Sequence, residues 1–317
     1  MTRLDTDASE TIGRCLADQG PVARLFDARE VPLGGIRGNT VHRSLPQRQL
    51  PMVGAWCFLD RFDDDRADMR VLPHPHIGLQ TVTWPVAGDI RHRDSVGSDV
   101  VVRPRQLNIM TAGRGISHSE FSIGDHSLPM SGLQLWTALP GDMLSIDPFF
   151  EQHTELPVFT SPGLAATVFV GTMGDATSDA TAFTPLIGAD ATLQAGRTAS
   201  LPLDSTFEHA VMVIEGTLDV SGVALEPGPL LYLGTGRDSL EVSTRHGSRF
   251  VLLGGTPFAE EIIMWWNFVG RTHEEIVQAR EDWEEHSPRF GTVAGHGTER
   301  IPAPPLPNVR LTPRRRG

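Results

Sequence analysis

The chain has 317 residues, of which 39% are hydrophobic and 21% charged, with a formal net charge of −12. This composition is typical of a folded protein of about two ordinary domains, and the negative charge argues against direct nucleic-acid binding. All 27 basic residues are arginine, which excludes mechanisms that need a lysine Schiff base or a lysine general base. The two cysteines, Cys15 and Cys57, indicate neither a disulfide framework nor a Cys-x-x-Cys site.

The first part of the chain is polar, and we expect residues 1–21 to be a mobile N-terminal segment. No stretch is long and apolar enough to span a bilayer, and "MTRLDTDASE" contains no apolar core of a targeting signal. The sequence therefore predicts a cytoplasmic protein with no membrane partner.

Residues 22–140 alternate between short apolar runs and turn signals such as "PLGG", "VAGD", "SVGS" and "TAGRG". The 32 glycines and 24 prolines of the chain fit many short strands joined by tight turns better than a helical bundle. The spacing predicts an all-β barrel or sandwich. The predicted strand cores are Gly54–Leu59, Leu79–Val86, Val100–Arg103, Leu107–Met110 and Leu133–Ala138.

A second strand-rich block follows at residues 160–258, after a proline-rich stretch at 141–159 that reads as a linker. It repeats the order of the first block: an apolar strand, a glycine turn, a short strand, another turn and another apolar strand. Two divergent copies of one β-unit are the simplest explanation.

The pattern changes in residues 259–292, which predict a strand followed by one helix. Thr272 and Glu275 have the spacing of a capping box, and Ile276, Ala279 and Trp283 would share one helical face. Residues 293–317 are rich in proline and arginine and predict a disordered tail.

Two histidines, His74 and His76, are spaced two apart in the strand-like segment "VLPHPHIGLQTVTW". In a strand such residues project from one face, about 7 Å apart along the backbone. His118 and Glu120 repeat this spacing in "GISHSEF", after a glycine-rich turn that allows a strand to return beside an earlier one. Alone, the first pair could equally be two core or surface histidines, but the second pair favours a shared metal site.

Three neutral nitrogens and one carboxylate suit one divalent transition metal ion, namely Fe(II), Mn, Co, Ni, Cu or Zn, better than Mg or Ca. An octahedral ion would keep two positions open for water, dioxygen or substrate. A closed structural zinc site is the alternative, although such sites usually use cysteine.

Several nearby residues have two interpretations each. His92 either supports the ligands from behind or faces solvent, and the solvent-facing role is the simpler interpretation. Gln80 either lines the cavity with His74 and His76 or serves packing. The same choice between cavity and core applies to Leu79, Val82, Trp84 and Ile109. Asp94 reads most simply as a turn residue.

The segments "LPHPHIGLQTVTW", "RHRDSVGS", "NIMTAGRGISHSE" and "GLQLWTALP" resemble, in this order, the signature segments of the pirin family. The resemblance covers roughly residues 30 to 290 and includes "LLGGTPFAEEIIMWWNFVG" near the end. It implies a bicupin: two cupin barrels of the double-stranded β-helix, jelly-roll type, packed together with a C-terminal helix. It also implies one metal ion, usually iron, held in the first barrel by His74, His76, His118 and Glu120. Many cupins carry a glutamate where this chain has Gln80, but in pirins the second motif supplies the carboxylate.

Two functions follow from this resemblance. The first is a quercetin 2,3-dioxygenase-like enzyme that opens a small aromatic, flavonol-like substrate with dioxygen, with Glu120 as ligand and candidate base. The second is a non-catalytic, iron-dependent redox sensor that regulates transcription or metabolism through a protein partner. The sequence alone does not favour either strongly.

Overall fold

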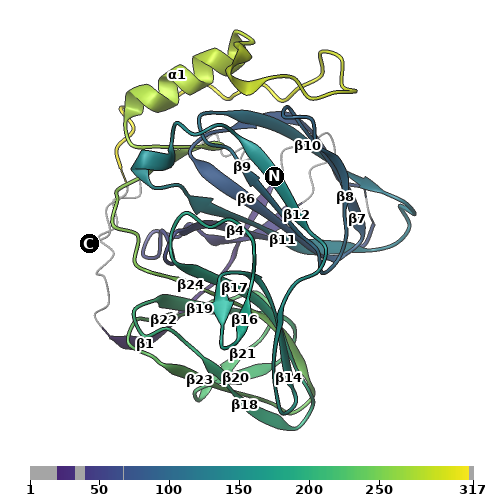
Figure 1. Ribbon diagram of the computed structural model, residues 1–317, viewed down its shortest axis with the longest axis vertical. Coiled ribbons are helices and arrows are strands. Elements are labelled where there is room, and N and C mark those ends of the chain that lie inside the picture. The colour runs from purple at the N-terminus through teal and green to yellow at the C-terminus, as the bar shows by residue number, and fades with distance from the viewer. Residues whose placement is uncertain (1–19, 33–39, 67, 314–317) are drawn as a thin grey trace.

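The structure of the chain is a computed structural model that describes residues 20–32, 40–66 and 68–313. The expected mobile segment at residues 1–21 therefore lies almost entirely outside the described residues. The described chain is almost all β, with 26 strands and one α-helix. Figure 1 shows two β-barrels stacked on one another, with the helix α1 beside the first barrel, at the end away from the second. The prediction of two β-barrels with a C-terminal helix is confirmed. Among the described residues, no helix is both long and apolar enough to cross a membrane.

The N-terminal barrel consists of two facing sheets. Its larger sheet has seven strands in the order β12-β9-β6-β11-β4-β3-β2, and its smaller sheet has four in the order β5-β10-β7-β8. The strands of the larger sheet are β2 (Arg29–Pro32), β3 (Thr40–Leu45), β4 (Trp56–Asp64), β6 (Leu79–Ala87), β9 (Leu107–Thr111), β11 (Met130–Ala138) and β12 (Phe149–His153). Those of the smaller sheet are β5 (Arg70–His76), β7 (Asp89–Asp94), β8 (Asp99–Val102) and β10 (Ile116–Ile123).

The C-terminal barrel repeats this arrangement, with a seven-stranded sheet β1-β22-β19-β24-β17-β14-β13 and a four-stranded sheet β18-β23-β20-β21. The strands of the larger sheet are β1 (Pro21–Phe26), β13 (Val158–Ser161), β14 (Leu164–Val170), β17 (Leu186–Leu193), β19 (Glu208–Gly216), β22 (Leu230–Gly234) and β24 (Ser248–Gly255). Those of the smaller sheet are β18 (Arg197–Pro202), β20 (Leu218–Val220), β21 (Val223–Leu225) and β23 (Ser239–Thr244). The connections carry the 3₁₀ turn η1 (Gly141–Met143) and the hairpin β15 (Thr172–Met173) and β16 (Ala176–Thr177).

Strand pairing crosses two of the expected domain boundaries. Strand β1 belongs by sequence to the expected N-terminal domain, but it pairs with β22 of the C-terminal sheet. Strand β12 lies in the expected linker at 141–159, but it pairs with β9 and forms an edge of the N-terminal sheet. Composition does not show the pairing partner of a short strand, so these boundaries could not be placed from sequence.

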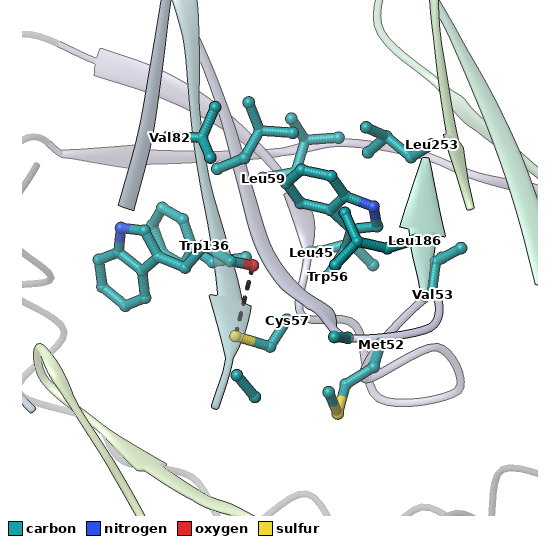
Figure 2. Packing of buried hydrophobic residues seen from close by; sticks show 14 of the residues in the cluster. Leu45, Met52, Val53, Trp56, Cys57, Leu59, Val82, Trp136, Leu186 and Leu253 are labelled. Carbon is teal, nitrogen blue, oxygen red and sulfur yellow. Dashed lines mark hydrogen bonds between the residues drawn. The ribbon is translucent and has the colours of Figure 1, made fainter. Parts of the chain in front are cut away.

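The two larger sheets pack against each other and form the largest apolar core of the described chain. Figure 2 shows Leu186 and Leu253 of the C-terminal barrel lying beside Trp56 and Leu59 of the N-terminal barrel. The indole Nε1 of Trp56 donates to the carbonyls of Ile187 and Gly254 at 3.1 and 3.2 Å. This core contains all the residues considered as cavity formers: Leu79, Val82, Trp84 and Ile109.

Asp190 is a buried anchor of this interface. It accepts hydrogen bonds from Trp84 Nε1 at 2.9 Å and from Arg249 Nη2 at 2.6 Å. We expect Asp190→Ala to lower the free energy of unfolding by about 2–3 kcal/mol, because it leaves a guanidinium and an indole N–H without their acceptor. Denaturant titration measures this loss. Asp99→Ala, which breaks an exposed pair with Arg91, is the control and should change stability little; equal effects would contradict the interface role.

The chain after the second barrel returns to the first. It forms the hairpin β25 (Ile263–Trp265) and β26 (Phe268–Gly270), the helix α1 (His273–Glu284) and the 3₁₀ turn η2 (Pro288–Phe290). The predicted capping box is present, with the Thr272 side chain accepting from the backbone of Glu275 and the Glu275 side chain accepting from that of Thr272. The predicted inner face of the helix is buried and consists of Ile276, Ala279 and Trp283.

The prediction of a disordered tail is wrong for residues 293–313, whereas 314–317 lie outside the described residues. This segment has no helix or strand, yet the carbonyl of Ile301 accepts from Trp283 Nε1 at 2.9 Å and its N–H donates to Pro73 at 2.8 Å. A proline-rich composition prevents regular secondary structure, but it does not prevent the backbone from bonding to an existing barrel.

Candidate metal centre

The two strands that carry the paired motifs are neighbours. Strand β10 pairs with β5 in antiparallel register, with His118 opposite His74 and Ile116 opposite His76. A glycine turn brings β10 back: Gly113 has a φ of +49°, and a Cβ there would lie 2.2 Å from the carbonyl oxygen of Ile146. Only glycine fits such a position without displacing the backbone. The side chains of His74, His76, His118 and Glu120 are all buried, with at most 1% of each residue exposed.

The three histidines converge inside the first barrel. Their candidate ligand nitrogens lie within 4.8 Å of one another, and Nε2 of His76 is 3.1 Å from Nε2 of His118. Two nitrogens that bind one ion at about 2.1 Å and at right angles lie about 3.0 Å apart. The Nδ1 of His74 lies 2.9 Å from the carbonyl of Leu72, which places the proton on Nδ1. Its Nε2 is buried and has no hydrogen-bond partner among the described residues. This geometry fits a metal ion.

Burial sets the protonation of these groups. Desolvation lowers the pKa of His74 to about 3 and lowers the pKa of His76 and His118 well below the usual value, helped by mutual repulsion within the cluster. Burial by itself would raise the pKa of the Glu120 carboxyl, but the neighbouring histidines and the Thr83 hydroxyl contribute to an overall decrease. At neutral pH the site therefore holds neutral imidazoles and one carboxylate, the forms that bind metal ions.

The carboxylate of Glu120 is not part of the three-histidine group. It forms a second group with His92 and His118, whose candidate ligand atoms also lie within 4.8 Å of one another. Thr83 Oγ1 lies 3.0 Å from Glu120 Oε1 and 3.1 Å from Gln134 Oε1. His118 is thus the residue that the two groups share.

His92 lies behind His118 and does not face solvent. The Nδ1 atoms of the two rings are 3.4 Å apart, and His92 Nε2 lies 3.2 Å from Oδ2 of Asp94. The other oxygen of Asp94 accepts from the backbone of Val96 and Ser98. Burial acts to raise the pKa of Asp94, but the hydrogen bonds from His92 and Ser98 lower it overall. A carboxylate that orients a histidine is the usual support of a metal ligand.

Gln80 does not line the site with His74 and His76, contrary to one of its two interpretations. Its amide donates to Thr111 Oγ1 at 2.9 Å and to the carbonyl of Thr181 at 3.1 Å, on the side facing the second barrel. The chain passes from one sheet to the other at Gly78, which has a φ of +68°. Alternation counted from His76 therefore fails beyond this glycine.

Three polar residues near the site had no assigned role in the sequence: Thr83, Gln134 and Trp136. Thr83 and Gln134 pair across β6 and β11, and the Trp136 ring lies edge-on to His76 with centroids 5.3 Å apart. Trp136 also stacks on Phe58. In "GLQLWTA", Gln134 and Trp136 alternate with apolar residues. This alternation was the sequence signal that could have placed both side chains on the same face of the strand.

Comparison with known proteins agrees with this description. The Pirin family matches residues 38–137 and the Pirin C-terminal cupin domain matches residues 188–291. A Pseudomonas aeruginosa protein named "Putative quercetin 2,3-dioxygenase PA1205" is 43% identical over 284 residues, which are 88% of this chain and 89% of that protein. A pirin-like protein of Caulobacter vibrioides is 37% identical and covers 88% of this chain and 98% of its own length.

Among solved structures, quercetin 2,3-dioxygenase from Acinetobacter baumannii superposes with a TM-score of 0.86 at 39% identity, covering 93% of this chain and 99% of that one. The two barrels, the convergent histidines and these matches lead to one assignment. The chain belongs to the pirin family.

Proposed function

We propose that this protein is a metal-dependent dioxygenase that opens flavonols such as quercetin with dioxygen. The observation that carries the proposal is the buried cluster of three neutral imidazoles, two of whose Nε2 atoms lie 3.1 Å apart. The names of the relatives from Pseudomonas aeruginosa and Acinetobacter baumannii supply the substrate class.

The residues that would hold the ion are His74, His76 and His118, with Glu120 as the fourth ligand. Neutral nitrogen ligands and one carboxylate fit Fe(II), which is our first choice, and also Mn, Co, Ni, Cu or Zn. His92 and Asp94 would hold the ring of His118 in place, and Thr83 would hold one oxygen of Glu120.

The bound ion would act as a Lewis acid on the substrate hydroxyl and as a template that brings it to dioxygen. The chain itself contributes a base and a dry environment. The Glu120 carboxylate is ionised, so it can accept the proton of the flavonol 3-hydroxyl. The surrounding wall is buried, which excludes water from the reacting groups.

The test is turnover by protein loaded in turn with each of these metals. We expect oxygen consumption and a matching loss of flavonol absorbance with at least one metal. Glu120→Gln, which removes the base, should lower kcat by about 100-fold or more, whereas Glu151→Gln on β12 is the control outside both groups. Absence of turnover with every metal would contradict the proposed dioxygenase activity. Metal-dependent capture of a specific protein would then favour the regulatory alternative.

A further inference from the structure

We propose that residues 268–303, here called the C-terminal clamp, hold the two metal-carrying strands in the geometry that binds the ion, with Ser119 and His296 as positioning residues. This inference rests on the metal centre proposed above, but not on turnover. It concerns the outer side of the sheet whose inner side carries the ligands.

On β10, the residues that alternate with the proposed ligands are bonded to the clamp. Because His118 and Glu120 point inward, Ser117 and Ser119 point outward. Ser117 Oγ donates to the carbonyl of Phe290 at 2.9 Å, and Ser119 Oγ is hydrogen-bonded to His296 Nε2 at 2.9 Å. Both serines are buried, with 1% of each exposed, so neither hydroxyl bonds to bulk water instead.

On β5, the clamp reaches the residues on either side of the histidine pair. The N–H of Ile301 donates to the carbonyl of Pro73 at 2.8 Å, directly before His74. The N–H of Val269 donates to the carbonyl of Ile77 at 3.1 Å, directly after His76. Each of the four proposed ligands therefore has a chain neighbour that is hydrogen-bonded to the clamp.

The clamp is itself anchored. Phe290 packs on Phe268 and Trp283, with ring centroids 5.9 and 5.7 Å apart. Arg289 Nε donates to the carbonyl of Arg114, in the glycine turn that precedes β10. Ordering a segment costs about 1–2 kcal/mol per residue in backbone entropy, so a chain without regular structure stays in place only through such contacts. Residues 292–303 also lie beyond the part matched by the family domains, which ends at residue 291.

The physical reason for a metal-dependent role is that a strand pair can twist and shear. Nitrogen positions that must match an ion to within a few tenths of an ångström are sensitive to this motion. Bonds to both strands from one anchored segment restrict it, as outer partners of metal ligands do in general.

The experiment measures the dissociation constant for Co(II) by competition with a chelator, together with the visible spectrum of the bound ion, on the full chain. We expect Ser119→Ala and His296→Ala each to weaken Co(II) binding by about 10-fold and to change the spectrum. The double variant should bind Co(II) no more weakly than either single variant, because each substitution removes the same hydrogen bond. His296→Gln, whose amide can reach Ser119, should restore most of the affinity.

Arg310→Ala is the matched control. Arg310 lies in the same tail beyond the clamp, and among the described residues it forms only an exposed pair with Glu274 of α1, away from β5 and β10. Unfolding of the metal-free variants is measured in parallel. Unchanged Co(II) affinity in Ser119→Ala and His296→Ala would overturn the proposed role of the clamp. Losses of Co(II) affinity that only parallel a general loss of stability, in Arg310→Ala as well, would also overturn it. If His296→Ala does not fold, Ser117→Ala and Ser119→Ala, which remove one hydroxyl each, decide the question. Failure of the unmodified protein to bind Co(II) would instead overturn the metal centre itself.

Discussion

Replacing His118 by alanine is expected to abolish stable metal binding. His118 is the residue common to both candidate ligand groups, and its two ring nitrogens face His76 on one side and His92 on the other. Loss of an outer partner typically weakens a metal site by about 10- to 100-fold, so loss of this ligand should weaken it by more than about 100-fold. Elemental analysis and chelator competition measure the effect.

The control for this variant is His153→Ala. His153 lies on β12 of the same barrel and belongs to neither ligand group among the described residues. It should leave metal content unchanged. Metal occupancy that is the same in His118→Ala and in the unmodified protein would remove His118 from the proposed centre.

Acid is expected to destabilise the metal-free protein steeply below about pH 6.5. In the unfolded chain the imidazoles of His74, His76 and His118 take up protons near their ordinary pKa of 6.5, whereas burial keeps them neutral in the folded protein to much lower pH. The unfolded state therefore binds more protons in this window, and the free energy of unfolding falls as the pH falls. Each histidine contributes up to about 1.4 kcal/mol per pH unit, or about 4 kcal/mol for three.

Urea unfolding between pH 5 and 8 tests this expectation, with the metal removed by chelation. His118→Asn should give a shallower dependence, because its side chain takes up no proton in either state. Bound metal should protect the fold against acid until protons displace it. A metal-free protein that is as stable at pH 5 as at pH 7.5 would show that the three imidazoles are not buried as described.

The residues of the site could be chosen from sequence because the relevant geometry is local. Alternation along a strand places His74 with His76 and His118 with Glu120 without knowledge of the fold. The same holds for the capping box of Thr272 and Glu275, which depends on one helical turn. The resemblance to pirins then supplied the architecture that composition left open between barrel and sandwich.

Residues that depend on a partner far along the chain were misread or missed. Gln80 was counted in phase with His76, but Gly78 ends that phase. Asp94 does bond the turn that follows it, as predicted, but the sequence did not show that its other oxygen supports His92 behind His118. His296 was assigned to a disordered tail, because nothing in its own segment indicates that Ser119 lies opposite.

The sequence by itself determined which side chains share a strand face and that the chain builds two similar barrels of short strands. Only the tertiary structure decided which strands meet: β1 with the second barrel, β12 with the first, and the C-terminal segment with the outer side of the metal-carrying sheet. The physical reason is that alternation and capping arise from neighbouring residues, whereas pairing and docking depend on backbone groups that are alike in every residue and find partners only when the whole chain has packed.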